Sequence, residues 1–321
     1  MKVIVFGGAG YLGGALVPQL LAAGHQVTVF DNLSFGRAAV DPVIADRNYR
    51  LIISDMRDIQ AVTEAVKDHE AVILLAALVG EPACDRNPSQ TVAINYLATL
   101  NVMNAAIYYG IKRFIFTSTD SCYGAQENVF LTEDAPLKPI SLYAELKARV
   151  EEEFLNLPRP DSFHPVILRL ATLYGLAPRM RFDLVINLLA REAIVGQGAK
   201  IFSGEQWRPL VHVSDAARAF VLALEAPAEL VSGRIFNVGS NEQNVQFKDL
   251  AKILLQVIPE AKIETVPQPP DLRDYHVCFD KISTVLNFSP ELKPADGIEE
   301  IKQALLSGRL PDPYDSKYRN S

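Results

Sequence analysis

The first 23 residues constrain the fold of this chain more than any other stretch. Residues 2–6 form a short apolar run that suits a strand buried on both faces of a sheet. Glycines follow at Gly7, Gly8, Gly10 and Gly13, and apolar residues then recur at helical spacing as far as residue 23. Such a turn between a strand and a helix lets the backbone approach a pyrophosphate at the positive end of the helix. We therefore expect a dinucleotide-binding site here.

The glycine spacing fits two motifs. Gly8, Gly10 and Gly13 fit G-x-G-x-x-G, the general dinucleotide motif. Gly7, Gly10 and Gly13 fit G-x-x-G-x-x-G, the spacing of short-chain dehydrogenases. The glycines alone do not decide between the two.

Asp31 predicts which dinucleotide is bound. It ends a second apolar run, residues 26–30, about 20 residues beyond the glycines, where a carboxylate accepts both ribose hydroxyls of NAD. The sequence favours NAD over NADP, because a 2′-phosphate would meet this negative charge with no arginine directly after it. Arg37 lies further along the same polar turn.

The composition narrows the class of protein. With 321 residues, 49% of them hydrophobic, the chain can bury the core of one large domain or of two intimate ones. A net charge of −7 without a basic run argues against nucleic acid as a main partner. The 3 cysteines are too far apart to indicate a disulfide framework or a metal cluster, and no apolar stretch has membrane-spanning length. Because residue 2 already belongs to a predicted strand, we expect no signal peptide and a cytoplasmic protein without a membrane partner.

Three more apolar runs extend the predicted sheet. Residues 51–54, 71–77 and 113–117 each have the pattern of a buried strand, and a helix is expected over residues 88–109. Five strands joined by four crossovers predict an α/β fold with a doubly wound parallel sheet. Ligands of such sheets lie beyond the carboxyl ends of the strands, so the loop of residues 78–85 is a candidate for substrate contact.

Residues after the third and fourth strands are candidates for cofactor contact. Asp55 could accept from the adenine amine, or it could cap the helix that starts near Asp58. Ala76 and Ala77 are small enough for the backbone to pass close to the cofactor ribose.

A tyrosine and a lysine stand four residues apart in a predicted helix that begins at residue 142. Tyr143 and Lys147 therefore share one face of that helix. Such a pair is by itself usually an exposed packing pair. Here the fifth strand ends in hydroxyl side chains, including Thr119, that can reach the same place. The arrangement indicates an active site at the carboxyl edge of the sheet.

These segments together resemble the extended short-chain dehydrogenase/reductase family, and within it the NAD-dependent nucleotide-sugar epimerases and dehydratases. The matching segments are the glycine turn, Asp31 with Asn32 and Leu33, the Ala76-Ala77 strand end, the S-x-x-x-x-Y-G segment ending at Gly124, Tyr143-x-x-x-Lys147, R-L-A-T-L-Y-G at residues 169–175 and R-P-L-V-H-V-S-D at residues 208–215. The resemblance favours the G-x-x-G-x-x-G spacing. It implies a Rossmann-like NAD-binding domain over residues 1–170, to which residues 211–240 return. Residues 171–210 and 241–321 would form a smaller mixed α/β substrate lobe.

The resemblance also assigns roles. Tyr143 would be the general base, Lys147 would hold the nicotinamide ribose, and Thr119 would orient the sugar hydroxyl. A free phenol has a pKa of about 10, and a lysine ammonium one turn away favours its phenolate form. Proton removal from the sugar 4-hydroxyl would accompany hydride transfer from C4 to NAD, leaving a 4-keto sugar. The implied cofactor contacts are Gly7, Gly10, Tyr11, Leu12, Gly13, Asp31, Asn32, Asp55, Met56, Leu75, Ala76, Ala77, Tyr143 and Lys147.

The two residues after Thr119 bear on the fate of that keto sugar. Return of hydride to its other face makes a 4-epimerase, whereas loss of a proton at C5 and of water at C6 makes a 4,6-dehydratase. Dehydratases of this branch typically carry Thr-Asp-Glu, but this chain has Thr119-Asp120-Ser121. Asp120 is a candidate acid or a carboxylate that holds the turn, and a Ser121 hydroxyl cannot be the C5 base.

The main hypothesis is therefore a nucleotide-sugar 4-epimerase that returns its NAD to the starting state in each cycle. A 4,6-dehydratase and a 4-keto reductase on the same fold are alternatives. A catalytically silent NAD-sensing regulator is a third, against which the intact Tyr143–Lys147 pair counts.

The substrate implied by the resemblance is a UDP-, GDP-, CDP- or dTDP-linked sugar. Its expected contacts are Gly80, Thr119, Asp120, Thr172, Arg179, Asn187, Arg208 and Arg273. Thr172 stands where many family members have Asn. Gln268 stands where many have a phosphate-binding Arg, so Arg273 is expected to take over that role.

Three expectations concern the rest of the chain. His212, between two valines, is interpreted as a core histidine with satisfied hydrogen bonds. The tail from Pro311, rich in Pro, Asp and Tyr, is expected to be loose. The family resemblance suggests a homodimer through the helices near residues 88–109 and 142–154.

Overall fold

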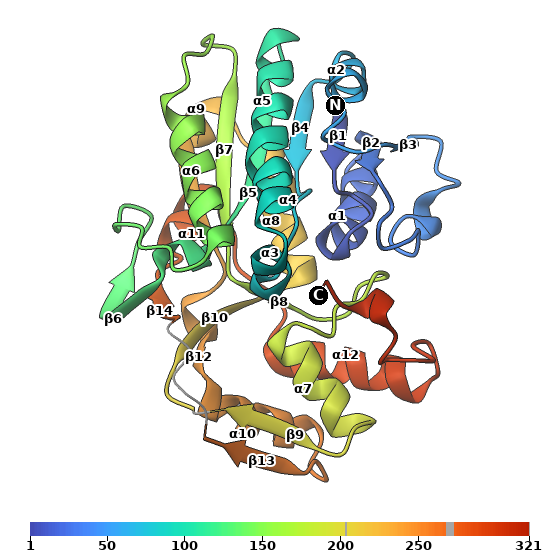
Figure 1. Ribbon diagram of the computed structural model, residues 1–321, viewed down its shortest axis with the longest axis vertical. Helices are drawn as coiled ribbons and strands as arrows, with labels where there is room; N and C mark the ends of the chain where they lie inside the picture. The colour runs from blue at the N-terminus through green and yellow to red at the C-terminus, as the bar shows by residue number, and fades with distance from the viewer. Residues whose placement is uncertain (203, 268–272, 321) are drawn as a thin grey trace.

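A seven-stranded sheet forms the larger part of the molecule. The computed structural model describes residues 1–202, 204–267 and 273–320 (Figure 1). The strand order is β11-β7-β5-β4-β1-β2-β3, and every neighbouring pair is parallel. The strands are β1 (Lys2–Phe6), β2 (Gln26–Asp31), β3 (Tyr49–Ile53), β4 (Ala71–Leu74), β5 (Arg113–Thr119), β7 (His164–Leu170) and β11 (Arg234–Val238). The predicted α/β class is confirmed, and β7 and β11 extend the five predicted strands on the β5 side.

Helices cover both faces of this sheet. Along β1, Val3 and Val5 pack into one apolar core, whereas Ile4 and Phe6 pack into another, because successive side chains of a strand point to opposite faces. The first core is closed by α1 (Tyr11–Ala22) and α8 (Val213–Glu225). The second is closed by α2 (Ile59–Val66), α5 (Thr99–Tyr108) and α6 (Leu142–Asn156). In Figure 1, α5 and α6 lie in front of the sheet and α8 lies behind it, as a doubly wound sheet requires.

The chain direction across the sheet reverses between β1 and β4. From β1 the chain moves outward through β2 and β3, and from β4 it moves the other way through β5, β7 and β11. Loops that leave the two central strands therefore diverge and open a crevice at their carboxyl ends.

Two predicted elements differ from the structure close to this crevice. The strand expected over residues 71–77 ends at Leu74, because the N–H groups of Leu75 and Ala76 both donate to the Phe6 carbonyl, at 2.9 Å each, and draw the chain out of the ladder. The loop expected over residues 78–85 contains a short helix, α3 (Glu81–Arg86).

The helix expected over residues 88–109 consists of three segments, α4 (Pro88–Val92), the π-helical η2 (Ala93–Ala98) and α5. In η2 the buried Asn95 pairs with the backbone of Leu78, accepting from its N–H at 2.7 Å and donating to its carbonyl at 2.8 Å. This contact ties the wide turn to the loop after β4.

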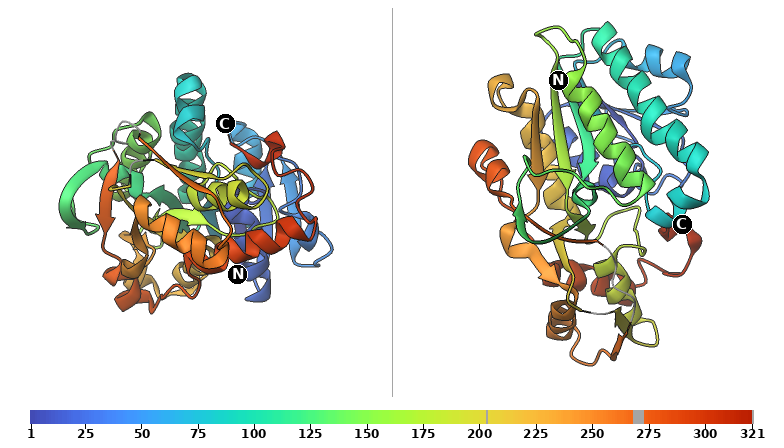
Figure 2. Two further views of the ribbon diagram at one scale, coloured as in Figure 1. Left: turned by 90° about the horizontal axis from the view of Figure 1, so that it is seen from below. Right: turned by 60° about the vertical axis from the view of Figure 1, so that its left-hand side comes forward.

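A smaller part of the molecule lies below the carboxyl ends of the strands (Figures 1 and 2). It contains three small sheets with the strand orders β12-β10-β8, β13-β9 and β14-β6. Their strands are β6 (Ala125–Leu131), β8 (Thr172–Tyr174), β9 (Ala199–Phe202), β10 (Trp207–His212), β12 (Asn244–Gln246), β13 (Ile263–Val266) and β14 (Asp274–Val277). The other helices of the described residues, from both parts of the molecule, are α7 (Val185–Ile194), α9 (Ala228–Val231), α10 (Phe247–Val257), α11 (Asp280–Leu286) and α12 (Pro294–Leu306). The 3₁₀ turns are η1 (Asp41–Val43), η3 (Asp120–Tyr123), η4 (Asn241–Gln243) and η5 (Ser316–Tyr318).

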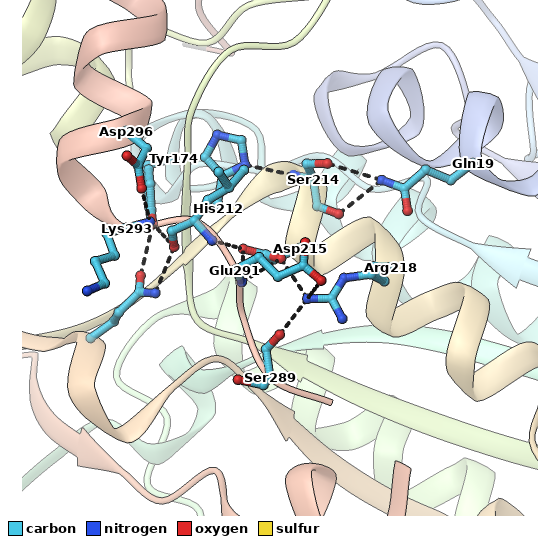
Figure 3. Close-up of polar contacts among 12 residues, drawn as sticks. Gln19, Tyr174, His212, Ser214, Asp215, Arg218, Ser289, Glu291, Lys293 and Asp296 are labelled. Atoms are coloured by element: carbon cyan, nitrogen blue, oxygen red, sulfur yellow. Dashed lines mark hydrogen bonds and ion pairs between the residues drawn. The ribbon is translucent and has the colours of Figure 1, made fainter. Parts of the chain in front are cut away.

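The predicted R-P-L-V-H-V-S-D segment joins the two parts. Figure 3 shows His212 and Asp215 at the start of α8, where Nδ1 of His212 accepts from the Ser214 N–H at 3.2 Å. Nε2 of His212 lies 3.0 Å from a carboxylate oxygen of Glu300 in α12, so the expectation of a satisfied core histidine is confirmed. Asp215 accepts from the N–H groups of Glu291 and Leu292 in the segment before α12, at 2.9 to 3.0 Å.

The expectation of a loose C-terminal tail is wrong. The tail contains η5, and Tyr318 packs edge-on against Phe182, with 5.7 Å between the ring centroids. The Tyr318 carbonyl accepts from the Phe182 N–H at 2.8 Å, and the Tyr314 ring lies 4.5 Å from the Arg191 guanidinium.

Within the described ranges, none of the helices combines the length and apolarity needed to cross a bilayer. The same residues contain no cluster of three or more His, Cys, Asp or Glu side chains placed to hold a metal ion.

Candidate active site

A cavity of about 540 Å³ lies at the carboxyl ends of β1, β2, β4 and β5, where the chain direction reverses. It brings together most of the residues that the sequence nominated. Those that line it are Gly7, Gly10, Tyr11, Leu12, Gly13, Asp31, Asn32, Asp55, Met56, Leu75, Ala76, Ala77, Gly80, Thr119, Tyr143, Lys147, Thr172, Arg179 and Arg273. Asp120, Asn187 and Arg208 are absent from the lining, and Gln268 lies outside the described residues.

The glycine turn has the geometry that a bound pyrophosphate needs. Gly7 has a φ of 80°, and a Cβ there would lie 2.5 Å from the Ala76 nitrogen, so β1 and the end of β4 approach as only glycine allows. A Cβ on Gly13 would lie 2.3 Å from the Gly8 carbonyl oxygen. Gly10 is the N-cap of α1 and has no side chain to occupy the helix N-terminus. These residues fit a dinucleotide phosphate at the start of α1.

Asp31 faces the cavity with its carboxylate fixed by the backbone. One oxygen accepts from the Ala9 N–H of the glycine turn at 3.0 Å and the other from the Leu33 N–H at 2.8 Å. Burial raises the pKa of this carboxyl, and the two N–H donors oppose the rise. The carboxylate is thus preorganised beside the turn, where ribose hydroxyls of a dinucleotide would lie.

Asp55 does not cap α2. Asp58 is the N-cap, and its side chain accepts from the Ala61 N–H at 3.1 Å. Asp55 instead binds the Arg57 guanidinium at 2.7 to 2.9 Å, and this hydrogen bond lowers the pKa of the Asp55 carboxyl to about 2. Of the two interpretations of Asp55, contact with the adenine amine is the one left open.

Tyr143, Lys147 and Thr119 meet at one side of the cavity. Ser141 caps α6 by accepting from the Ala144 N–H at 3.3 Å, which sets Tyr143 and Lys147 in the first turns of that helix. Nζ of Lys147 donates to the Thr117 carbonyl at 2.7 Å and lies 5.8 Å from the centroid of the Tyr143 ring. Burial lowers the pKa of Lys147 to about 8, so the ammonium is still the main form at neutral pH. Hydroxyl, phenol and ammonium therefore share one edge of the sheet.

Asp120 lies behind this edge. Its side chain is 1% exposed, does not line the cavity, and neither carboxyl oxygen has a hydrogen-bond partner. Burial raises the pKa of this carboxyl well above its ordinary value, while the Arg169 guanidinium opposes the rise. Arg169 is committed to Glu151 in a buried ion pair, with Nη2 2.6 Å from Oε2. The role of an acid that touches substrate is not supported by this position.

Asn187 holds protein backbone together. It is fully buried, and its side-chain oxygen accepts from the Gly175 N–H at 2.9 Å. Its amide donates to the Arg181 carbonyl at 2.9 Å and to the Tyr11 hydroxyl at 3.1 Å. The residue expected to contact substrate thus fastens the segment after β8 to the start of α1.

Arg208 also lies behind the cavity wall. The side chain is 4% exposed and donates to the carbonyls of Trp207, at 2.7 Å, and of Arg273. Arg273 lines the cavity, so Arg208 contacts the backbone of a wall residue.

Some residues of the wall have no counterpart among the predicted contacts. Phe35, Ser121, Tyr275 and Asn320 line the cavity as well. Ser121 and Tyr275 belong to segments that the sequence singled out for other residues. Asn320 lies in the tail, where no motif pointed to it.

Known proteins similar to this chain indicate the family to which these cavity residues belong. The model of the NAD-dependent epimerase/dehydratase family matches residues 3–239. The chain is 31% identical to a UDP-glucose 4-epimerase of Corynebacterium glutamicum over 257 residues, which are 75% of this chain and 76% of that protein. It is 29% identical to a dTDP-glucose 4,6-dehydratase of Streptomyces niveus over 313 residues, 94% of this chain and 91% of the relative. The crystal structure of a dTDP-glucose 4,6-dehydratase from Streptomyces venezuelae with NAD bound superposes with a TM-score of 0.84 at 27% identity, covering 96% of this chain and 98% of that one.

Proposed function

Because the chain belongs to the NAD-dependent epimerase/dehydratase family of extended short-chain dehydrogenases, we propose that it is a nucleotide-sugar 4-epimerase. NAD is the cofactor of this family. The relatives include epimerases, dehydratases and decarboxylases of nucleotide sugars, so the proposal depends on the residues at the cavity.

The observation that carries the proposal is that the residues which the structure describes beside Thr119 include no acid–base pair. A dehydratase needs a base for the C5 proton and an acid for the departing C6 hydroxyl. Ser121 lines the cavity but has no basic form at neutral pH, and Asp120 is buried outside the lining. The residues left beside Thr119 fit reversible oxidation at C4 better than elimination.

The proposed chemistry uses three side chains. The Tyr143 phenolate accepts the proton of the sugar 4-hydroxyl, and Thr119 donates a hydrogen bond that holds the sugar oxygen in place. The Lys147 ammonium, held by the Thr117 carbonyl, stabilises the phenolate by its charge. NAD, when bound, would supply a reversible acceptor for the C4 hydride. Asp31 and the start of α1 would hold the adenosine ribose and the pyrophosphate.

A panel of UDP-, GDP-, CDP- and dTDP-sugars incubated in deuterated water and followed by NMR tests this proposal. A 4-epimerase moves the C4 hydride internally, so the epimeric product carries no solvent deuterium. A 4-keto-6-deoxy product would contradict the proposal and indicate a dehydratase. Solvent deuterium in a product that keeps its C6 hydroxyl would also contradict it and would indicate epimerisation at a carbon beside the ketone.

Substitution of Tyr143 by Phe separates chemistry from cofactor binding. We expect turnover to fall by a factor of about 10³ or more, because the general base is lost, whereas NAD content stays unchanged. The matched control is Tyr108→Phe, a change at a phenol that is 82% exposed on α5. Undiminished turnover in Tyr143→Phe would contradict the assignment of the base.

We also propose a homodimer through the helices near residues 88–109 and 142–154. Exposed apolar side chains support it, since Leu97 in η2 is 52% exposed and Leu155 in α6 is 37% exposed. Light scattering after gel filtration tests it, and a monomeric mass at micromolar concentration would contradict it.

A further inference from the structure

A cation from the smaller part of the molecule reaches the cofactor end of the cavity. The segment of residues 175–179 crosses the start of α1, where the Tyr11 hydroxyl donates to the Gly175 carbonyl at 2.6 Å. A Cβ on Gly14 would lie 3.3 Å from the Pro178 ring, so this segment touches the first turn of the helix. Arg179 follows directly and lines the same cavity as Gly10 and Gly13.

The guanidinium of Arg179 is buried with a free donor. The residue is 3% exposed, and its Nε has no hydrogen-bond partner. Burial, with a smaller effect from Arg181, lowers the pKa of Arg179 to about 10. A buried guanidinium with an unpaired N–H is costly unless an anion completes its hydrogen bonds.

Two neighbours fix the plane of this guanidinium. Its carbon atom Cζ lies 4.0 Å from the centroid of the Phe35 ring, which follows β2 and also lines the cavity. Nη2 donates to the Asn320 side chain at 2.5 Å and to the Arg319 carbonyl at 3.3 Å. The tail and the loop after β2 therefore both contact Arg179 and hold it in place.

The neighbouring arginine differs in one respect. Arg181 also lines the cavity, but its charge is matched by Asp183, with 2.7 Å between Nη2 and Oδ2. Within the described ranges, Arg179 forms no ion pair with a carboxylate. Of the two, Arg179 is the one whose charge an incoming anion would neutralise.

We propose that Arg179 binds the pyrophosphate of NAD from across the cavity, opposite the N-terminus of α1, and that tail residues 318–320 hold it there. The sequence had placed Arg179 at the substrate. Its position beside the first turn of α1 and on Phe35, four residues after Asp31, assigns it to the cofactor instead. NAD would then be held between the two parts of the molecule, which favours a cofactor that stays bound through many cycles.

The test measures NAD dissociation without any sugar, so it is independent of which reaction the enzyme catalyses. Arg179→Gln and a matched control, Arg37→Gln, are purified without added NAD, diluted into NAD-free buffer, and sampled for protein-bound NAD over time. Arg37 carries the same charge on the loop after β2, is exposed and pairs with Asp41 outside the cavity. A charge-assisted hydrogen bond implies dissociation roughly 10- to 100-fold faster in Arg179→Gln, and no change in Arg37→Gln.

Further variants separate the parts of the proposal. Arg179→Lys keeps the charge but loses the planar fork, and should fall between the wild type and Arg179→Gln. Asn320→Ala should accelerate dissociation less than Arg179→Gln does. Circular dichroism of the NAD-free variants checks that they fold, and if Arg179→Gln does not, Arg179→Lys and Asn320→Ala decide by the same measurement.

Two results would overturn the proposal. One is unchanged NAD dissociation in the folded arginine variants together with weaker binding of UDP or dTDP, which would return Arg179 to the substrate. The other is equal acceleration in Arg179→Gln and Arg37→Gln, which would reduce the effect to general electrostatics.

Discussion

The residues of the two cavity walls could not be predicted equally well from the sequence. The wall formed by the sheet edge and α6 contains every nominated residue except Asp120. The wall formed by the smaller part contains Thr172, Arg179 and Arg273, but Asn187 and Arg208 lie behind it. The difference is one of distance along the chain. Residues of the first wall stand at or just after the end of a strand or in the first turns of a helix, whereas positions in the second wall depend on contacts far away in sequence.

Asn187 illustrates that dependence. Its side chain binds Gly175, Arg181 and Tyr11, and the last of these belongs to the first wall. A motif can place an Asn on α7, but it does not show that the side chain turns toward protein backbone. The smaller part of the molecule therefore has a structural role besides lining the cavity, since Asn187 holds a residue of the first wall in place.

Replacement of Asn187 tests this division with the largest expected effect on stability. Asn187→Ala removes three buried hydrogen bonds, although the Tyr11 hydroxyl keeps its bond to the Gly175 carbonyl, so the free energy of unfolding should fall by about 2–4 kcal/mol. The measurement is urea unfolding of the NAD-free protein. Thr172→Val is the control on the same side of the cavity, and it should change the substrate KM with little loss of stability. A raised KM in Asn187→Ala without a loss of stability would put Asn187 back at the substrate.

The secondary structure could likewise be predicted where it depends on nearby residues and not where it depends on distant contacts. Apolar runs with a glycine turn or an end in polar residues predicted β1, β2 and β5 to within two residues at each end, because burial on both faces leaves few other interpretations. The end of β4 could not be predicted in this way, since it depends on the Phe6 carbonyl accepting two N–H groups. The tail could not be predicted either. Its composition is that of a loop, and its order comes from packing on Phe182 and Arg191, which lie on other elements of the chain.

Asp120 is the one nominated residue of the sheet edge that does not line the cavity. The pH dependence of stability tests whether it is buried away from the cavity as the structure indicates. Burial raises the pKa of its carboxyl, so the folded protein keeps a proton that the unfolded chain has already lost. Stability should therefore fall as pH rises from the unfolded pKa toward the folded one, by up to about 1.4 kcal/mol per pH unit from this group. Asp120→Asn lacks this contribution, so its free energy of unfolding should rise relative to that of the wild type as the pH increases above the ordinary pKa of an aspartate.

The exposed Asp134→Asn serves as the control and should follow the wild-type pH dependence in urea unfolding. Turnover of Asp120→Asn should stay within severalfold of the wild type if Asp120 touches no substrate. A loss of turnover of a hundredfold or more, with unchanged stability at all pH values, would show that Asp120 acts as a catalytic acid.

Asp31 and Asp55, the two carboxylates on the cofactor side of the cavity, differ in the direction of their pKa shifts. Their titration gives the smallest expected effect of these predictions. Burial raises the pKa of Asp31, whereas Arg57 holds that of Asp55 at about 2. A protonated Asp31 accepts fewer hydrogen bonds from the ribose, so NAD affinity should weaken as the pH falls toward the raised pKa of Asp31, at a milder pH than for an ordinary aspartate. Titration calorimetry at several pH values measures this. The slope should vanish in Asp31→Asn and persist in Asp55→Asn, because Asp55 stays ionised throughout that range. A slope that disappears only in Asp55→Asn would reverse the assignment of the two carboxylates.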